Sequence, residues 1–169
     1  SKNIAREMNK TFFEVILAKG FDKAAMNIFK KKKNMRLIDI TNFKFDNNTS
    51  IKTFGNTFLL QDKDSFVFEN KNLKFVTNKK PTKHELRDIK FAFKICKFVK
   101  SNAIVIVKDN STIGIGAGQQ NRLDSSKIAV QKAKQFQPGK LFNSVAASDA
   151  FFPFADGIKT LIKAGVKLI

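Results

Sequence analysis

The sequence predicts an α/β fold in which strands alternate with helices and form a layered, largely parallel or mixed sheet flanked by helices. One observation is a set of short apolar runs, such as A-I-V-I-V at residues 103–107, which are typical of buried strands. Another is a set of longer segments with apolar residues three or four positions apart, the spacing of a helix with one buried face. Turn-forming sequences such as Lys108-Asp109-Asn110-Ser111 separate these segments.

In the N-terminal part of the chain, Gly20 turns the backbone and Asp22 has the side chain of a helix N-cap. Residues 42–50 are polar and turn-rich, so we expect a subdomain join or an insertion around residues 42–72. The expected helices are residues 3–12 and 23–32, and the expected strands are residues 13–18, 35–41, 51–54, 57–61 and 73–77.

In the C-terminal part, Thr82 and Glu85 form a capping-box pattern that predicts the start of a helix. The apolar face of this helix is expected to contain Leu86, Ile89, Phe93 and Cys96. After the glycine-rich stretch, a helix is expected to begin at Asp124 or Ser125 and to continue through residue 133, before Pro138-Gly139. The remaining expected elements are a strand at residues 142–147, a helix at 156–164 and a strand from 166 onward.

The chain carries a formal net charge of +18, from 32 Lys and Arg against 14 Asp and Glu. Clustered basic residues would indicate nucleic-acid binding, in which Lys and Arg neutralise phosphates. The lysines are instead spread through every segment, and no RNP, zinc-finger or recognition-helix pattern accompanies them. A solvated lysine-rich surface, or a positive field that attracts small anionic substrates, therefore explains the charge better.

The chain contains one cysteine, Cys96, and one histidine, His84, so neither an internal disulfide nor a zinc cluster is expected. Cys96 lies among apolar residues and is expected to pack as a small core residue. His84 is expected to be an exposed residue in the first turn of a helix. No apolar run approaches membrane-spanning length and no signal-peptide pattern opens the chain, so we expect a cytoplasmic location without membrane contact.

The most informative stretch is residues 100–122, which predicts a strand, a tight turn, a second strand, a glycine loop and a helix start. Its glycines are Gly114, Gly116 and Gly118. Gln119 interrupts the G-x-G-x-x-G fingerprint of dinucleotide-binding proteins, and no G-K-[ST] follows for a phosphate-binding loop. A glycine run of this kind is either a tight connection or a loop that approaches a ligand closely.

Residues 100–122 and the later string S-D-A-F-F-P-F at residues 148–154 occur together in one known family, in the same order. The chain closely resembles the AICAR transformylase domain of the bifunctional AICAR transformylase/IMP cyclohydrolase family, over nearly its whole length and more loosely at residues 42–72. With this resemblance we favour a ligand-facing glycine loop. The resemblance also implies a fold similar to that of the cytidine deaminases, although the zinc-binding motifs H-x-E and P-C-x-x-C are absent.

The resemblance implies that residues 1–169 are a C-terminal portion of the transformylase domain, without the cyclohydrolase domain and the extreme C-terminus. The chain begins at Ser1 inside a helical pattern and ends in a strand-like run, so both ends look cut. The family's Lys-His catalytic pair, in the motif K-H-x-N-P-C-G, is not in this sequence, and His84 does not match it. We therefore expect the isolated chain to be inactive.

The family transfers a formyl group from 10-formyltetrahydrofolate, its cosubstrate, to AICAR in purine (IMP) biosynthesis and requires no metal. The resemblance places Asn102 against the carboxamide and reacting amine of AICAR, with an orienting role in catalysis. It places Arg122 on the nucleotide, Glu14 near the ribose hydroxyls and Phe151 against the base. The residues implied on the folate side are Leu123, Pro153, Phe154 and Asp156, while Ala155 replaces a frequent arginine.

The parent protein is expected to be a cytosolic homodimer with sites at the interface, and no nucleic-acid partner is expected. Two alternatives from other classes remain open at this point. One is a basic nucleic-acid-binding domain, and the other is a nucleotide-binding module without catalysis.

Overall fold

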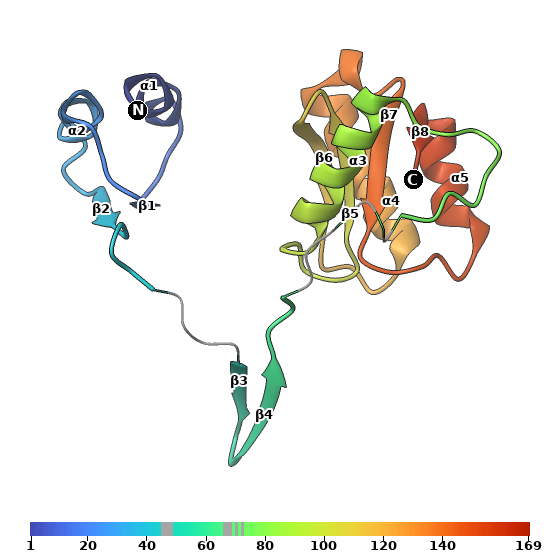
Figure 1. Cartoon of the computed structure of the whole chain (residues 1–169), viewed down its shortest axis with the longest axis horizontal. Coiled ribbons are helices and arrows are strands. Elements are labelled where there is room, and N and C mark those ends of the chain that lie inside the picture. The colour runs from blue at the N-terminus through green and yellow to red at the C-terminus, as the bar shows by residue number, and fades with distance from the viewer. Residues whose placement is uncertain (45–48, 66–68, 70, 72) are drawn as a thin grey trace. The chain divides into compact units, whose positions relative to one another are not determined.

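A computed structural model describes residues 1–44, 49–65, 69, 71 and 73–169 of the chain (Figure 1). The chain divides into two compact units, Ser1–Ser65 and Phe66–Ile169, and each is described here by itself. The join or insertion expected around residues 42–72 includes residues 45–48, 66–68, 70 and 72, which lie outside the described residues; that expectation stays a prediction.

The first unit contains two helices packed beside a pair of parallel strands, with a core made by Ala5, Ile16, Ala25 and Phe29. Asp22 caps the second helix as expected, because its carboxylate accepts the backbone N–H of Ala25 at 2.6 Å. The elements are α1 (Lys2–Asn9), β1 (Val15–Ala18), α2 (Lys23–Phe29) and β2 (Arg36–Asp39).

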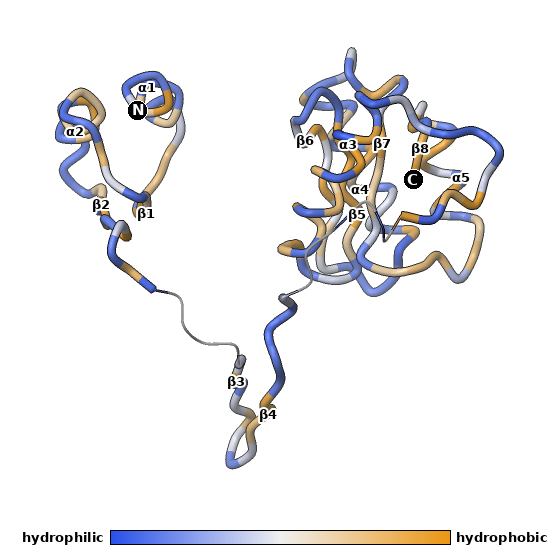
Figure 2. The backbone as a smooth tube through the Cα atoms, viewed as in Figure 1, coloured by the Kyte–Doolittle hydropathy of each residue, from blue (hydrophilic) through white to orange (hydrophobic). Residues whose placement is uncertain are grey.

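A β-hairpin, β3 (Thr49–Phe54) and β4 (Thr57–Asp62), completes the first unit (Figure 1). Apolar residues are interspersed along both strands (Figure 2), and Phe58 remains 70% exposed. The strand expected at residues 73–77 is wrong: these residues are irregular, and Val76 is 83% exposed. An alternating pattern forms a strand only where a neighbouring strand supplies hydrogen bonds.

The second unit is a four-stranded sheet in the order β6-β5-β7-β8, covered by helices. Its pairs are antiparallel except for β7–β8, so the sheet is mixed, and the predicted α/β class with a layered mixed sheet is confirmed. The likeness to cytidine deaminases stays a prediction. The elements are α3 (Lys83–Cys96), β5 (Ile104–Lys108), β6 (Ser111–Gly116), α4 (Arg122–Phe136), the short 3₁₀ helix η2 (Pro138–Lys140), β7 (Ser144–Ser148), α5 (Ala155–Lys163) and β8 (Val166–Leu168).

Strand β5 is the centre of the core, because helices cover both faces of the sheet around it (Figure 1). Ile104 and Ile106 point to the face packed by α4 and α5. Val105 and Val107 point to the opposite face and pack with the α3 residues Ala92 and Cys96. Residues 103–107 are all fully buried, which explains why they read as one continuous apolar run rather than an alternating one.

The buried line of α3 differs from the expected one. Asp88, Ala92 and Cys96 are its buried residues, whereas Phe93 is 38% exposed. Cys96 is the small core residue that was expected. Burial raises the pKa of its thiol to about 11, and the negative charge of Asp149 adds to that effect. A thiol with so high a pKa is a poor nucleophile near neutral pH.

The glycines of β6 serve packing, so the expectation of a ligand-facing loop is wrong for Gly114 and Gly116. A Cβ at Gly114 would overlap the carbonyl oxygen of Ala129, and one at Gly116 would overlap that of Ser125. Both carbonyls belong to α4, so these glycines allow the helix backbone to lie directly against the strand. Gly118 is different, since its φ of +67° is a conformation that favours glycine.

Replacing Gly116 with alanine should destabilise the chain, because the added Cβ must push α4 away from β6. We expect the free energy of unfolding to fall by about 1–3 kcal/mol. Gly139→Ala is the matched control, since nothing lies within 4 Å of a Cβ added there, and its effect should be below about 0.5 kcal/mol. Urea titrations followed by circular dichroism measure both variants. Equal stability of the two would contradict the proposed packing role.

The start of α3 is tied to the last strand through Glu85. The predicted capping box is present: Thr82 and Glu85 exchange hydrogen bonds at the helix N-terminus. The other Glu85 oxygen lies 2.5 Å from the ammonium group of Lys167 in β8. The hydrogen bond from Lys167, followed by that from the Thr82 backbone, lowers the pKa of Glu85 from 4.5 to about 2.

This depressed pKa predicts an acid-sensitive contribution to stability. Because the folded pKa lies below the unfolded one, Glu85 stabilises the fold above pH 4.5, and the contribution is lost as the pH falls toward 2. Glu85→Gln should therefore flatten the dependence of unfolding free energy on pH in that window. Glu7→Gln, at an exposed pair with Lys10, is the control and should keep the wild-type slope. A wild-type slope in Glu85→Gln would contradict this assignment.

Candidate functional site

Three strand ends meet at one edge of the sheet of the second unit. Residue Ile104 at the start of β5 pairs with Gly116 at the end of β6 and with Ser148 at the end of β7. The connection after β6 continues beside the segment before β5, because Gly118 N–H donates to Lys100 O at 2.8 Å. The side chains that precede β5 and follow β6 and β7 are therefore brought together there.

A cavity of about 410 Å³ opens at this edge. It collects six residues that sequence analysis assigned to ligand binding, from segments separated by up to about 50 positions. The predicted members are Asn102, Arg122, Leu123, Pro153, Phe154 and Asp156, and the others are Gln120, Asn121 and Phe152.

Asn102 is half-buried and held through both its backbone and its side chain. Its carbonyl oxygen accepts the Ser125 hydroxyl at 2.7 Å, and its Nδ2 donates to the carbonyl of Gln119 at 2.8 Å. Ser125 is fully buried in the first turns of α4. These contacts leave the Oδ1 acceptor and the second N–H of Nδ2 for a ligand in the cavity.

Arg122 is the first residue of α4, which begins earlier than expected. Asn121 is the N-cap, since its side chain accepts the N–H of Asp124 at 2.8 Å, so a start at Asp124 or Ser125 is wrong. Local sequence offers several good capping residues here, and the one chosen is set by where the connection from β6 ends.

The guanidinium of Arg122 is anchored on one side. Its Nε donates to Ser148 Oγ at 3.1 Å, and its Nη2 donates to Asp149 Oδ1 at 3.1 Å. A guanidinium has five N–H donors, so further donors remain for an anion in the cavity. Burial opposes ionisation of Asp149, but hydrogen bonds from Ser101 and Ala103 and the charge of Arg122 outweigh it and lower its pKa.

The aromatic string after β7 contributes unequally to the cavity. Phe152 is half-buried, packs against the core and lines the cavity, and Phe154 lines it while 73% exposed. Phe151 is 79% exposed and does not line it within this chain, so its contact with a base stays a prediction. Asp156 accepts the N–H of Gly157 at 2.6 Å through Oδ1 at the start of α5.

Glu14 belongs to the first unit. It is exposed, directly precedes β1, and its carbonyl oxygen accepts the N–H of Arg36 at 2.8 Å. Because each unit is described by itself, the ribose contact implied for Glu14 stays a prediction.

Comparison with known proteins identifies the family of this chain. Residues 1–132 match the family model described as AICARFT/IMPCHase bienzyme. The chain belongs to this family. Its relatives include the bifunctional purine biosynthesis protein PurH of Prochlorococcus marinus, 45% identical over 99% of this chain and 32% of the relative. Those of Trichodesmium erythraeum and Bartonella bacilliformis are 43% and 44% identical over 98% of this chain. The chain spans about a third of the length of these relatives.

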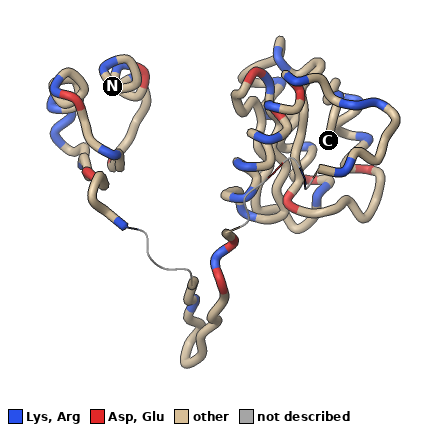
Figure 3. Tube along the Cα trace, in the orientation of Figure 1, with Lys and Arg blue, Asp and Glu red and all other residues tan. Residues whose placement is uncertain are grey.

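The charge of this family member is distributed rather than gathered. Lys and Arg occur along both units (Figure 3), consistent with their spread in the sequence. None of the helices formed by the described residues combines the length and apolar character needed to cross a membrane.

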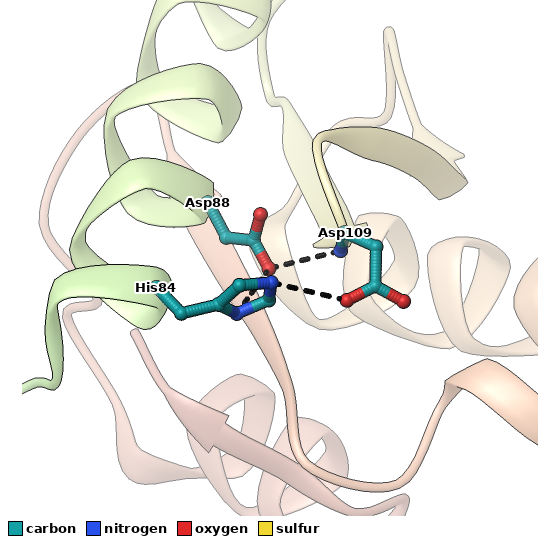
Figure 4. Close-up of side chains that lie close together, drawn as sticks. All are labelled: His84, Asp88 and Asp109. Carbon is teal, nitrogen blue, oxygen red and sulfur yellow. Dashed lines mark hydrogen bonds and ion pairs between the residues drawn. The ribbon is translucent and has the colours of Figure 1, made fainter.

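A second group of titratable side chains lies away from the cavity, where the β5–β6 turn meets α3 (Figure 4). Asp88 is buried, and its two oxygens accept the N–H groups of Asp109 and Asn110 at 3.0 and 2.8 Å. Both turn residues have positive φ, near 55°. Asp88 therefore satisfies and fastens the predicted tight turn.

His84 completes this group and is 47% exposed, in agreement with the expected first-turn position. Its Nε2 lies 3.3 Å from Asp109 Oδ1, whereas its other nitrogen, Nδ1, lies 3.8 Å from Asp88 Oδ2. A metal ion would bond to only one ring nitrogen, but here the carboxylates face different ones. The Nε2–Asp109 contact links α3 to the turn, whereas the 3.8 Å separation from Asp88 is too long for a hydrogen bond.

The residues that sequence analysis missed at the cavity are Gln120, Asn121 and Phe152. Asn121 carried a usable signal, because it stands three residues before Asp124 as an N-cap does. Phe152 could be separated from Phe151 only by knowing which ring the core of the second unit accepts.

Proposed function

We propose that this chain forms part of the ligand-binding site of a formyltransferase that moves a formyl group from 10-formyltetrahydrofolate to the 5-amino group of AICAR. The parent would act in purine biosynthesis, would also be an IMP cyclohydrolase, and would be a cytosolic homodimer with sites at its interface. The observation that carries the proposal is one cavity in a chain that belongs to the AICARFT/IMPCHase family. The residues that share it include Asn102, Arg122, Pro153, Phe154 and Asp156.

The chemistry of the cavity suits two different ligands. Arg122 supplies fixed positive charge for the anionic nucleotide, and Asn102 presents an amide oxygen that can accept a hydrogen bond from the reacting amine. Phe154 and Pro153 supply exposed apolar wall for a flat ring such as a pterin. Asp156 retains an oxygen outside its hydrogen bond to Gly157, which can accept a pterin N–H.

The transfer also requires a general base, a hydrogen-bond donor that stabilises the oxyanion, and alignment of the two ligands. Among the residues of this chain, Asn102 meets the requirement for alignment, because its position is fixed by Ser125 and Gln119. Glu14 at the ribose and Phe151 at the base, reaching a neighbouring subunit's site, complete the proposed nucleotide contacts. The reaction needs no metal in this proposal.

In the intact enzyme, Arg122→Ala should mainly raise the KM for AICAR, by about tenfold or more. Arg122 binds the nucleotide in ground state and transition state alike, so kcat should change little. Asn102→Ala should instead lower kcat by roughly 10–100-fold, because a misplaced amine loses its reactive geometry. Steady-state assays with varied AICAR measure both. Arg87→Ala, an exposed arginine on α3, is the control and should match wild type. An unchanged KM in Arg122→Ala would contradict the proposed site.

The isolated chain should not transfer formyl groups, since the K-H-x-N-P-C-G motif that supplies the family's Lys-His pair is not in its sequence. Purified chain is incubated with AICAR and 10-formyltetrahydrofolate, and formyl-AICAR is measured by chromatography. Turnover comparable to that of the intact enzyme would show that the chemistry resides in this chain and would overturn the assignment of roles.

A further inference from the structure

Asp149 lies where the three strand ends of the candidate site meet, and it contacts both neighbours of Asn102. Its Oδ1 accepts the backbone N–H of Ala103 at 3.0 Å, and its Oδ2 accepts the hydroxyl of Ser101. Its own backbone N–H donates to the carbonyl of Ala103 at 3.3 Å, which extends the pairing of β5 with β7. The backbone around Asn102 is thus held to Asp149 from both sides.

The same carboxylate holds Arg122. Asp149 Oδ1 accepts from Arg122 Nη2 at 3.1 Å, and the preceding residue, Ser148, accepts from Arg122 Nε at 3.1 Å. The side chains of Arg122 and Asp149 are only 16% and 18% exposed, so water weakens the ion pair less than it would at an open surface. Two adjacent residues at the end of β7 therefore fix both the position and the tilt of the guanidinium plane.

Asp149 itself does not line the cavity, whereas Arg122 and Asn102 both do. Neither of the neighbouring serines could take the place of Asp149 in this arrangement. The hydroxyl of Ser148 contacts the guanidinium alone. The hydroxyl of Ser125 contacts the carbonyl of Asn102 alone. Among these side chains, Asp149 is the one that contacts Arg122 and the residues flanking Asn102 together.

We propose that Asp149 is a positioning residue that holds Arg122 and the Asn102 segment in one fixed arrangement and acts on ligand binding through Arg122. This inference rests on the proposed function for its kinetic consequence, but its structural consequence is independent of it. Loss of Asp149 frees the guanidinium to adopt other orientations, so the ligand must fix it on binding. It also removes the acceptor that holds Ala103, so the segment before β5 loosens.

A double-mutant cycle in the intact enzyme tests whether Asp149 acts through Arg122. Asp149→Ala should raise the KM for AICAR about tenfold in the wild-type background and less than about twofold in the Arg122→Ala background. Ser148→Ala, which removes one neutral hydrogen bond, should raise KM by about threefold. A residue that merely supports the fold would raise KM equally in both backgrounds, and that result would overturn the proposal.

Hydrogen–deuterium exchange of the ligand-free intact protein gives a second readout that does not depend on the reaction. In Asp149→Ala, peptides covering residues 101–104 and 117–119 should exchange faster, since the hydrogen bonds of Ala103, Asn102 and Gly118 lie there. Ser148→Ala should leave these peptides unchanged. Wild-type exchange in Asp149→Ala would overturn the proposal.

The two readouts separate this inference from the proposed function. If the wild-type enzyme shows no AICAR-dependent formyl transfer, the proposed function fails, and exchange alone decides the positioning role. If Asp149→Ala does not fold, Asp149→Asn takes its place. Asparagine keeps one acceptor oxygen and the side-chain shape but removes the charge, so a smaller rise in KM, again suppressed by Arg122→Ala, is expected. Additive effects in that cycle would count against the proposal in the same way.

Discussion

The close packing of α4 against β6 is the constraint on which the candidate site depends. Helix and strand backbones meet at Gly114 and Gly116, where no Cβ fits. This contact fixes the position of α4 along the sheet. Arg122, in the first turn of the helix, and Ser125, which donates to the carbonyl of Asn102, are placed by it. A larger side chain in β6 would move the helix outward and separate the two binding residues, although neither glycine touches the cavity.

The chain has a net charge of +18, but at the site the positive charge with a fixed position is that of Arg122. Arg122 is a fixed cation because Ser148 and Asp149 occupy one side of its guanidinium. Most lysine ammonium groups stand at the ends of long, solvated side chains that sample many positions, so together they contribute a diffuse positive field. The diffuse field can attract anions, whereas the anchored arginine can select their orientation. Attraction of anions and selection of their orientation are therefore tasks of different basic residues.

Sequence patterns predicted the elements whose signals are local. The apolar run of β5 and the capping box of Thr82 and Glu85 are decided within a few residues, and both are present. The glycines were misread because a close approach to a helix and a close approach to a ligand require the same missing Cβ. The cavity residues were grouped only through the resemblance, since Asn102, Arg122 and Asp156 are far apart in the sequence and strand pairing brings their segments together.

The β5–β6 hairpin is fastened at both ends by carboxylates from other elements, Asp88 at its turn and Asp149 at its open end. Sliding β5 by one residue would exchange the side chains of its two faces, isoleucines toward α3 and valines toward α4. Because both sets are apolar, hydrophobic burial alone discriminates weakly between those registers. The two carboxylates accept specific backbone N–H groups, and in a shifted register these partners would be lost. The hydrogen bonds to Asp88 and Asp149 thus specify the register of β5, which its apolar side chains leave ambiguous.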